Sequence, residues 1–137
     1  SLVMSNIAVG SWDKLINWTT PALVGYNYSP MVIATGNFFA PVTGIYRFQV
    51  IWRPADNGST TGIRLAVVQG SNPEVDLQDY WSPISSVASP DSRSTGIGCW
   101  NVQLNAGDMV SVQGEAGPLG DAINYINWTG ALLCKTG

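Results

Sequence analysis

The chain gathers aromatic and ionisable side chains in one segment, where Asp79 precedes Tyr80 and Trp81 and where Asp91 and Arg93 follow in the next predicted loop. Exposed aromatic rings stack on sugar faces or anchor protein partners, while Asp and Arg side chains hold polar groups in place. These five residues therefore form the predicted ligand-binding surface. In the alternative interpretation, Trp81 packs beneath the long loop and has only a structural role.

The residue inventory offers little support for catalysis. The chain contains no His, so neither a Ser nor a Cys nucleophile has an imidazole to activate it. A glycosidase needs two carboxylates, and Asp76, Asp79 and Asp91 could supply them, but acids in loops are usually solvated. Cys99 and Cys134 form no CxxC motif, which leaves a zinc or redox site unsupported. We therefore expect a protein that is not an enzyme and that holds no cofactor and no metal.

Length and charge narrow the class of protein further. The 137 residues suit a single domain over positions 1–137, with residues 1–6 expected to be a flexible or added tail. Six Lys and Arg against nine Asp and Glu give a net charge of −3, which argues against nucleic acid as a partner. No apolar run reaches the roughly 18 residues that a membrane span requires, so we expect no membrane insertion.

Alternating polarity predicts β-strands throughout and no helix. Pro and Gly interrupt the chain at short intervals, and the runs between them are rich in β-branched and aromatic residues, a pattern typical of all-β sandwiches and barrels. The clearest strand is Gly44–Arg53, whose large apolar side chains all fall on one face. Further strands are predicted over Gly62–Gln69, Thr95–Leu104, Met109–Gln113 and Ile123–Cys134.

Several of these strands lack a charged face. Charged residues make up only 11% of the chain, against about 25% in an average protein, and monomers normally place Lys and Glu on their outer faces. We therefore predict that one sheet is covered on its second face by another subunit. The alternative is a monomer whose surface is rich in Ser, Thr and Asn. The predicted interface residues are Arg47, Gln49, Tyr125, Asn127, Thr129 and Leu133.

Three stretches, in order, resemble the globular head of complement-one-q proteins, a jelly roll shared with tumour necrosis factor. Phe38–Phe48 fits an aromatic residue, five others, and then Gly-x-Tyr-x-Phe. Val102–Val112 resembles the pattern v-x-L-x-x-G-D-x-V, and Trp128–Leu133 resembles the closing aromatic-x-G-x-L-L strand. Within these stretches, Gly44 and Gly107 would give turns their conformational freedom, and Asp108 could cap its own turn.

The resemblance implies a ten-stranded, two-sheet jelly roll that assembles as a homotrimer. It implies that Gly44–Arg53 lies between Thr95–Leu104 and Ile123–Cys134 in the inner sheet, and that Tyr46, Phe48, Trp128 and Leu132 fill the space between the sheets. Cys99 and Cys134 would then lie about two strand spacings apart, too far for a disulfide, and we expect two free, mostly buried thiols. Some relatives hold calcium near the trimer apex, which makes calcium a minor alternative here.

These observations favour a recognition module at a virion surface or outside the cell. The leading hypothesis is the trimeric, receptor-binding tip of a phage tail or bacterial surface fibre, which attaches to a host-cell glycan or protein. The first alternative is a secreted lectin or cytokine-like ligand of innate immunity. The second alternative is a purely structural head that only trimerises a fibre.

Overall fold

A computed structural model describes residues 12–15, 31–32, 35–54, 61–82, 95–116 and 123–137. Residues 1–6, Asp91 and Arg93 lie outside these ranges. The described residues contain no helix and ten strands, as predicted for an all-β chain. The strands are β1 (Asp13–Lys14), β2 (Met31–Val32), β3 (Asn37–Phe39), β4 (Gly44–Pro54), β5 (Thr61–Val68), β6 (Val75–Asp76), β7 (Tyr80–Trp81), β8 (Gly96–Leu104), β9 (Met109–Ala116) and β10 (Ile123–Lys135).

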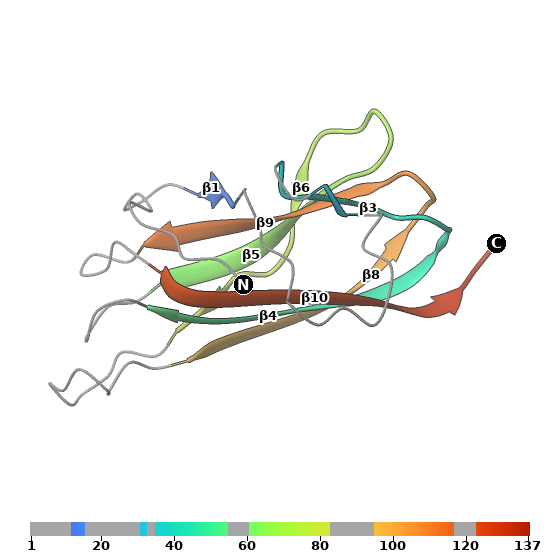
Figure 1. The fold of residues 1–137 in the computed structure, drawn as a ribbon. Helices are drawn as coiled ribbons and strands as arrows, with labels where there is room; N and C mark the ends of the chain where they lie inside the picture. Colours follow the sequence, from blue (N-terminus) through green and yellow to red (C-terminus); the bar gives the residue numbers. More distant parts are fainter. Residues whose placement is uncertain (1–11, 16–30, 33–34, 55–60, 83–94, 117–122) are drawn as a thin grey trace, which may run out of the picture.

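The strands form two sheets that lie one over the other (Figure 1). The smaller sheet has the order β10-β4-β8, and both pairings are antiparallel. This order confirms that the strand beginning at Gly44 lies between the other two. The larger sheet runs β2-β3-β9-β5-β6, with β1 paired to β9 and β7 paired to β5. The two-sheet jelly-roll architecture predicted from the sequence is therefore present.

Strand β4 shows how the sequence pattern produces the sandwich. Because successive side chains of a strand point to opposite faces, Tyr46, Phe48, Val50 and Trp52 all point between the sheets, and each is at most 2% exposed. The intervening side chains point away from the core. The predicted strand ended before Pro54, whereas the structure includes this proline as the last residue of β4, paired with Ile123. A proline is tolerated there because it stands at a strand end.

The core packs aromatic rings from both sheets. Phe48 lies with its ring centroid 5.3 Å from that of Phe38 and 6.2 Å from that of Trp128, so these rings join the two sheets as predicted. Leu132 was predicted to belong to this core, but it is 44% exposed. It pairs with Tyr46 near the beginning of β4, at the rim of the sandwich, where the core no longer covers it.

Two predicted glycine positions have different physical roles. Gly107 has a φ of 90°, in the left-handed region that favours glycine, and the neighbouring Asp108 carboxylate accepts the backbone N–H of Asn105 at 2.8 Å. The turn therefore has the predicted construction. Gly44 is required for another reason: a Cβ at this position would lie 2.5 Å from the carbonyl oxygen of Cys134. Close strand approach, rather than backbone freedom, selects glycine there.

Candidate functional site

Strand β7 separates the two predicted recognition aromatics. Tyr80 pairs with Ile63 and Trp81 pairs with Gly62, so their side chains point to opposite faces of the larger sheet. The Tyr80 ring lies edge-to-face with Trp100, with centroids 5.1 Å apart, and its hydroxyl donates to the carbonyl oxygen of Cys99 at 3.0 Å. Tyr80 is therefore a half-buried residue that joins the two sheets, and it is not part of an open recognition surface.

Trp81, in contrast, lies on the outer face and is 42% exposed. Its indole N–H donates to Oδ2 of Asp79 at 2.7 Å. On its inner side it rests over Gly62, where an added Cβ would lie 2.7 Å from Cε2 of Trp81 and 2.9 Å from Cη2 of Trp12. The missing side chain at Gly62 thus lets two indoles settle on the sheet. The structure brings Asp79 and Trp81 together as predicted and adds Trp12, which meets Trp81 edge-to-face with centroids 5.9 Å apart.

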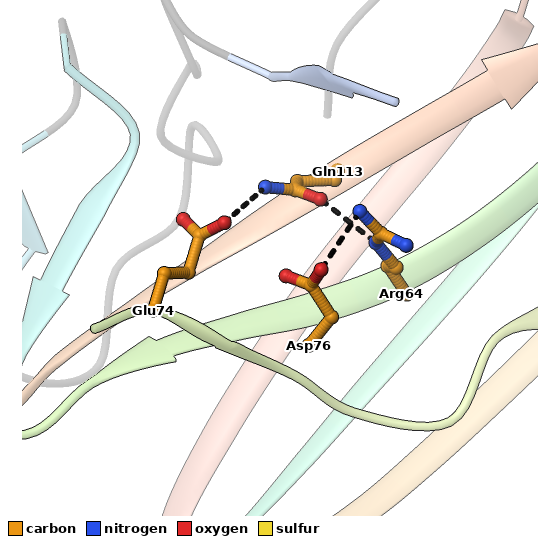
Figure 2. Close-up of polar contacts among 4 residues, drawn as sticks. All are labelled: Arg64, Glu74, Asp76 and Gln113. Atoms are coloured by element: carbon orange, nitrogen blue, oxygen red, sulfur yellow. Dashed lines mark hydrogen bonds and ion pairs between the residues drawn. The ribbon is translucent and has the colours of Figure 1, made fainter. Parts of the chain in front are cut away.

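A polar network continues this surface across β5 and β9 (Figure 2). Arg64 of β5 donates from Nε to Oε1 of Gln113 at 2.8 Å, and its Nη2 lies 3.0 Å from Oδ2 of Asp76. Gln113 of β9 in turn donates from Nε2 to Oε2 of Glu74 at 3.3 Å. The Arg64 guanidinium also lies over the Trp12 ring, 4.3 Å from its centroid. Arg64 is therefore held on three sides and is not a free cation.

Trp12, Arg64 and Gln113 were not predicted to be members of one surface. Alternation did place Arg64 and Gln113 on the outer sides of their strands, because Arg64 lies between the core residues Ile63 and Leu65 and Gln113 follows the core residue Val112. It did not show that Gln113 is only 8% exposed, or that Arg64 and Gln113 face each other in the β5–β9 register. Arg64 and Gln113 are 49 positions apart in the sequence, and local polarity does not reveal the register between strands. Their proximity could therefore not be predicted.

The described residues contain no candidate metal site. Among the described residues, no three side chains of His, Cys, Asp or Glu converge closely enough to hold an ion. The candidate glycosidase pair is likewise not assembled: Asp76 is engaged by Arg64, Asp79 by the Trp81 indole, and Asp91 lies outside the described residues.

The outer face of the β10-β4-β8 sheet has a different chemistry. Its side chains line up in rows across the register: Gln49 lies opposite both Thr129 and Cys99, and Arg47 lies opposite both Ala131 and Asn101. Arg47 donates from Nε to Oδ1 of Asn101 at 3.1 Å. We call this surface the small-sheet outer face; its rows run from Ile45 to Arg53 along β4.

This face carries most of the predicted interface residues. Arg47, Gln49, Asn127 and Thr129 lie on it in neighbouring rows, and Tyr125 pairs with Arg53 at its end. Leu133 is 47% exposed, but the register shifts between Leu132 and Cys134, so Leu133 does not continue the alternation that placed it there. The next row is instead completed by Cys134, opposite Ile45.

The small-sheet outer face is poor in charge and, in its described rows, exposes a large aliphatic side chain among uncharged polar ones. Ile97, in the row of Ile51, is 57% exposed. Arg47 and Arg53 are the charged side chains of its rows within the described residues, and no carboxylate is among them. Cys99 and Cys134 are free and exposed on this face. The prediction of mostly buried thiols is therefore wrong for the single chain, because both side chains point away from the core.

Several solved structures are similar to this chain over most of its length. The globular domain of zebrafish Complement 1qA protein aligns with a TM-score of 0.58 at 18% identity, over 96% of this chain and 98% of that chain. This chain has a complement-one-q/TNF-like jelly-roll fold. Eiger TNF from S. frugiperda aligns with a TM-score of 0.57 at 20% identity, over 75% of this chain and 68% of that chain. Murine APRIL aligns at 0.55 and 13% identity, over 93% and 92%.

The likeness of this jelly-roll domain to known proteins is one of structure. No protein-family model matches the chain, and no curated protein matches it either. The described residues of the jelly-roll domain include no helix long and apolar enough to cross a membrane. The comparisons thus establish the fold.

Proposed function

We propose that this jelly-roll domain is a non-enzymatic recognition head that works as a homotrimer outside the cell. The observation that carries the proposal is the small-sheet outer face, which exposes Ile97 and two thiols and has two arginines as its charged groups in the described rows. A surface that is depleted of charged residues and exposes a large aliphatic side chain is typical of the centre of a subunit interface. In an assembly of identical chains, the same charge-poor face of a neighbouring copy would cover it.

Assembly by this face leaves the opposite face of each subunit available for a partner. The larger sheet lies over the small sheet in the sandwich (Figure 1). Its outer face, which carries Trp81 over Gly62, therefore points away from the small sheet. A trimer would then present three identical recognition surfaces, and engaging several at once raises the apparent affinity without new contacts. A purely structural head would need no such surface.

The comparisons favour the ligand-domain alternative over the fibre-tip hypothesis. The similar structures include a complement protein of zebrafish and TNF-type proteins of S. frugiperda and mouse. No finding favours a phage tail or a bacterial fibre. The proposed role is therefore that of an extracellular ligand or lectin-like head, and a virion location has no support.

The test is the mass of the protein in solution with and without a charge in the proposed interface. Thr129 is exposed in the single chain, in the same row as Gln49 and Cys99. Burying an unpaired ammonium costs several kcal/mol, so Thr129→Lys should convert a trimer into monomers in sedimentation equilibrium at micromolar concentration. Ser71→Lys, at an exposed position after β5, is the matched control and should remain trimeric.

The unmodified protein decides the outcome. A mass three times that of the chain supports the proposal, and a monomer overturns it. Equal circular dichroism spectra of the two lysine variants would show that Thr129→Lys has not simply unfolded. A trimer that persists in folded Thr129→Lys would place the interface elsewhere.

A further inference from the structure

The exposed Trp81 is held in a fixed orientation, which makes it unlike an ordinary surface aromatic. The carboxylate of Asp79 accepts its indole N–H at 2.7 Å, the Trp12 ring meets its edge, and Gly62 leaves room for it on the sheet. Despite these contacts, 42% of its surface remains open. A binding group that is already ordered loses little conformational entropy when a ligand arrives. Trp81 thus has the properties of a preformed stacking platform.

Hydrogen-bonding groups lie beside this platform. Asp79 uses Oδ2 for the indole, and a carboxylate can accept several hydrogen bonds, so its Oδ1 is suited to a ligand hydroxyl. Indole faces pack against the C–H faces of pyranose rings, while neighbouring carboxylates accept from the hydroxyl groups at the ring edge. A small-ligand site usually consists of an aromatic or apolar surface with a few polar groups around it.

The charges of this surface restrict the ligand. Glu74, Asp76 and Asp79 lie within one six-residue segment that borders the tryptophans. Two cations lie nearby among the described residues. Arg64 is occupied by Asp76, Gln113 and the Trp12 ring, and Lys14, opposite Gln113 in the β1–β9 register, donates to Oδ1 of Asn37. Within the described residues, an anionic ligand would therefore meet carboxylates and cations that already have partners, and like charges at close range are repulsive. The net charge of −3 acts in the same direction at longer range.

We propose that Trp81, Asp79 and Trp12 form a binding site for neutral pyranose sugars, and that the site discriminates against sialylated and sulfated glycans. This inference rests on the proposed recognition function and specifies its ligand class. It replaces Tyr80 of the predicted surface with Trp12, because Tyr80 points between the sheets. A sugar stacks on Trp81, and Asp79 accepts from its hydroxyl groups.

The experiment presents the intact protein to an array of glycans that end in neutral hexoses, in sialic acid or in sulfated sugars. We expect signal on neutral glycans and none on the acidic ones. Trp81→Ala should lower this signal by at least about tenfold, since it removes the stacking surface. Phe39→Ala is the matched control: Phe39 is a 38% exposed aromatic on β3, which pairs with β9 at the other end from β1, and its loss should leave binding unchanged.

A second measurement reports on the residue directly. In protein labelled with ¹⁵N at its tryptophans, the indole N–H signal of Trp81, assigned by its loss in Trp81→Phe, should shift on titration with a methyl hexoside that is positive on the array. Asp79→Ala should weaken binding and move the same signal in the free protein.

The outcomes test the sugar site and the proposed trimer separately. Binding only to acidic glycans, binding unaffected by Trp81→Ala, or no binding to any neutral glycan overturns the sugar site. Sedimentation of the same samples separates the two ideas: a trimer without sugar binding contradicts the site alone, whereas a monomer that binds neutral sugars contradicts the trimeric assembly alone.

Discussion

The outer faces of the two sheets differ in how far their side chains find partners within the single chain. On the larger sheet, polar side chains satisfy one another within the chain: Arg64, Gln113, Asp76 and Glu74 form a continuous set of contacts. On the small sheet, Arg47 contacts Asn101, while Ile97 and the two thiols are exposed beside it. On the first face, these polar groups have partners within one chain. Under the proposed assembly, another subunit would cover the second face.

This difference shows that a count of charged residues is less informative than their placement. On the larger sheet's outer face Arg64 is paired with Asp76, whereas the described rows of the small sheet hold no acid. The same core lies beneath both faces. Changes to the core and to each face should therefore have separable effects.

The largest effect is expected in the shared core. Phe48 is 1% exposed and contacts rings from both sheets. Phe48→Ala should lower the free energy of unfolding by about 3–5 kcal/mol, because it removes buried apolar area and leaves a cavity. Urea denaturation measures this loss. A loss below about 1 kcal/mol, in the range of surface changes, would contradict the core assignment.

A matched pair of glutamines compares the two faces at intermediate effect size. Gln113 is buried between Arg64 and Glu74, whereas Gln49 is exposed on the small-sheet outer face. Gln113→Ala should cost about 1–3 kcal/mol because it leaves partners unsatisfied, and Gln49→Ala should change stability by about 0.5 kcal/mol or less.

Both glutamine variants are made in the Thr129→Lys background. Because this background is expected to be monomeric, assembly does not contribute to the measured free energies of unfolding. Denaturant unfolding of three proteins gives the values: Thr129→Lys alone, and Thr129→Lys combined with Gln113→Ala or with Gln49→Ala. Equal losses for the two glutamines in the monomeric background would remove the distinction between the faces.

The smallest effect concerns the ion pair of Arg64 and Asp76, whose side chains are 20% and 38% exposed. Asp76→Asn should cost about 0.2–1 kcal/mol, the usual value of a partly solvated pair. The loss should shrink in concentrated salt, because exposed charges are screened. Asp79→Asn, at a carboxylate that contacts an indole rather than a cation, should show no such salt dependence. A larger effect that persists in salt would mean that the pair is more deeply desolvated than its exposure indicates.

The strands with long alternating patterns could be predicted from the sequence, and the short ones could not. Strand β4 was recognisable because eleven residues repeat the same alternation. Strands β1 and β6 have two residues each, too few to establish a period, and they exist because β9 and β5 offer free edges. The order of the small sheet came from the family resemblance and not from the pattern itself.

The candidate site was only partly predictable for the same physical reason. Asp79 and Trp81 are neighbours in sequence, so their proximity could be expected. Trp12 reaches Arg64 and Trp81 only through the β1–β9 and β5–β9 pairings, which no local feature reveals. Tyr80 was misassigned because two adjacent aromatics look like one surface, although any strand places them on opposite faces. The register shift near Leu133 was equally invisible.

The central claim is that copies of this chain cover the small-sheet outer face, and Cys99 is its most direct probe. Cys99 lies in the middle of that face, opposite Gln49, and is exposed in the single chain. Native protein is treated with N-ethylmaleimide, and the label on each cysteine is followed by peptide mass spectrometry. The account predicts that Cys99 is protected in the unmodified protein and reactive in Thr129→Lys. Labelling of Cys99 in the folded, unmodified protein as fast as in the denatured chain would contradict it.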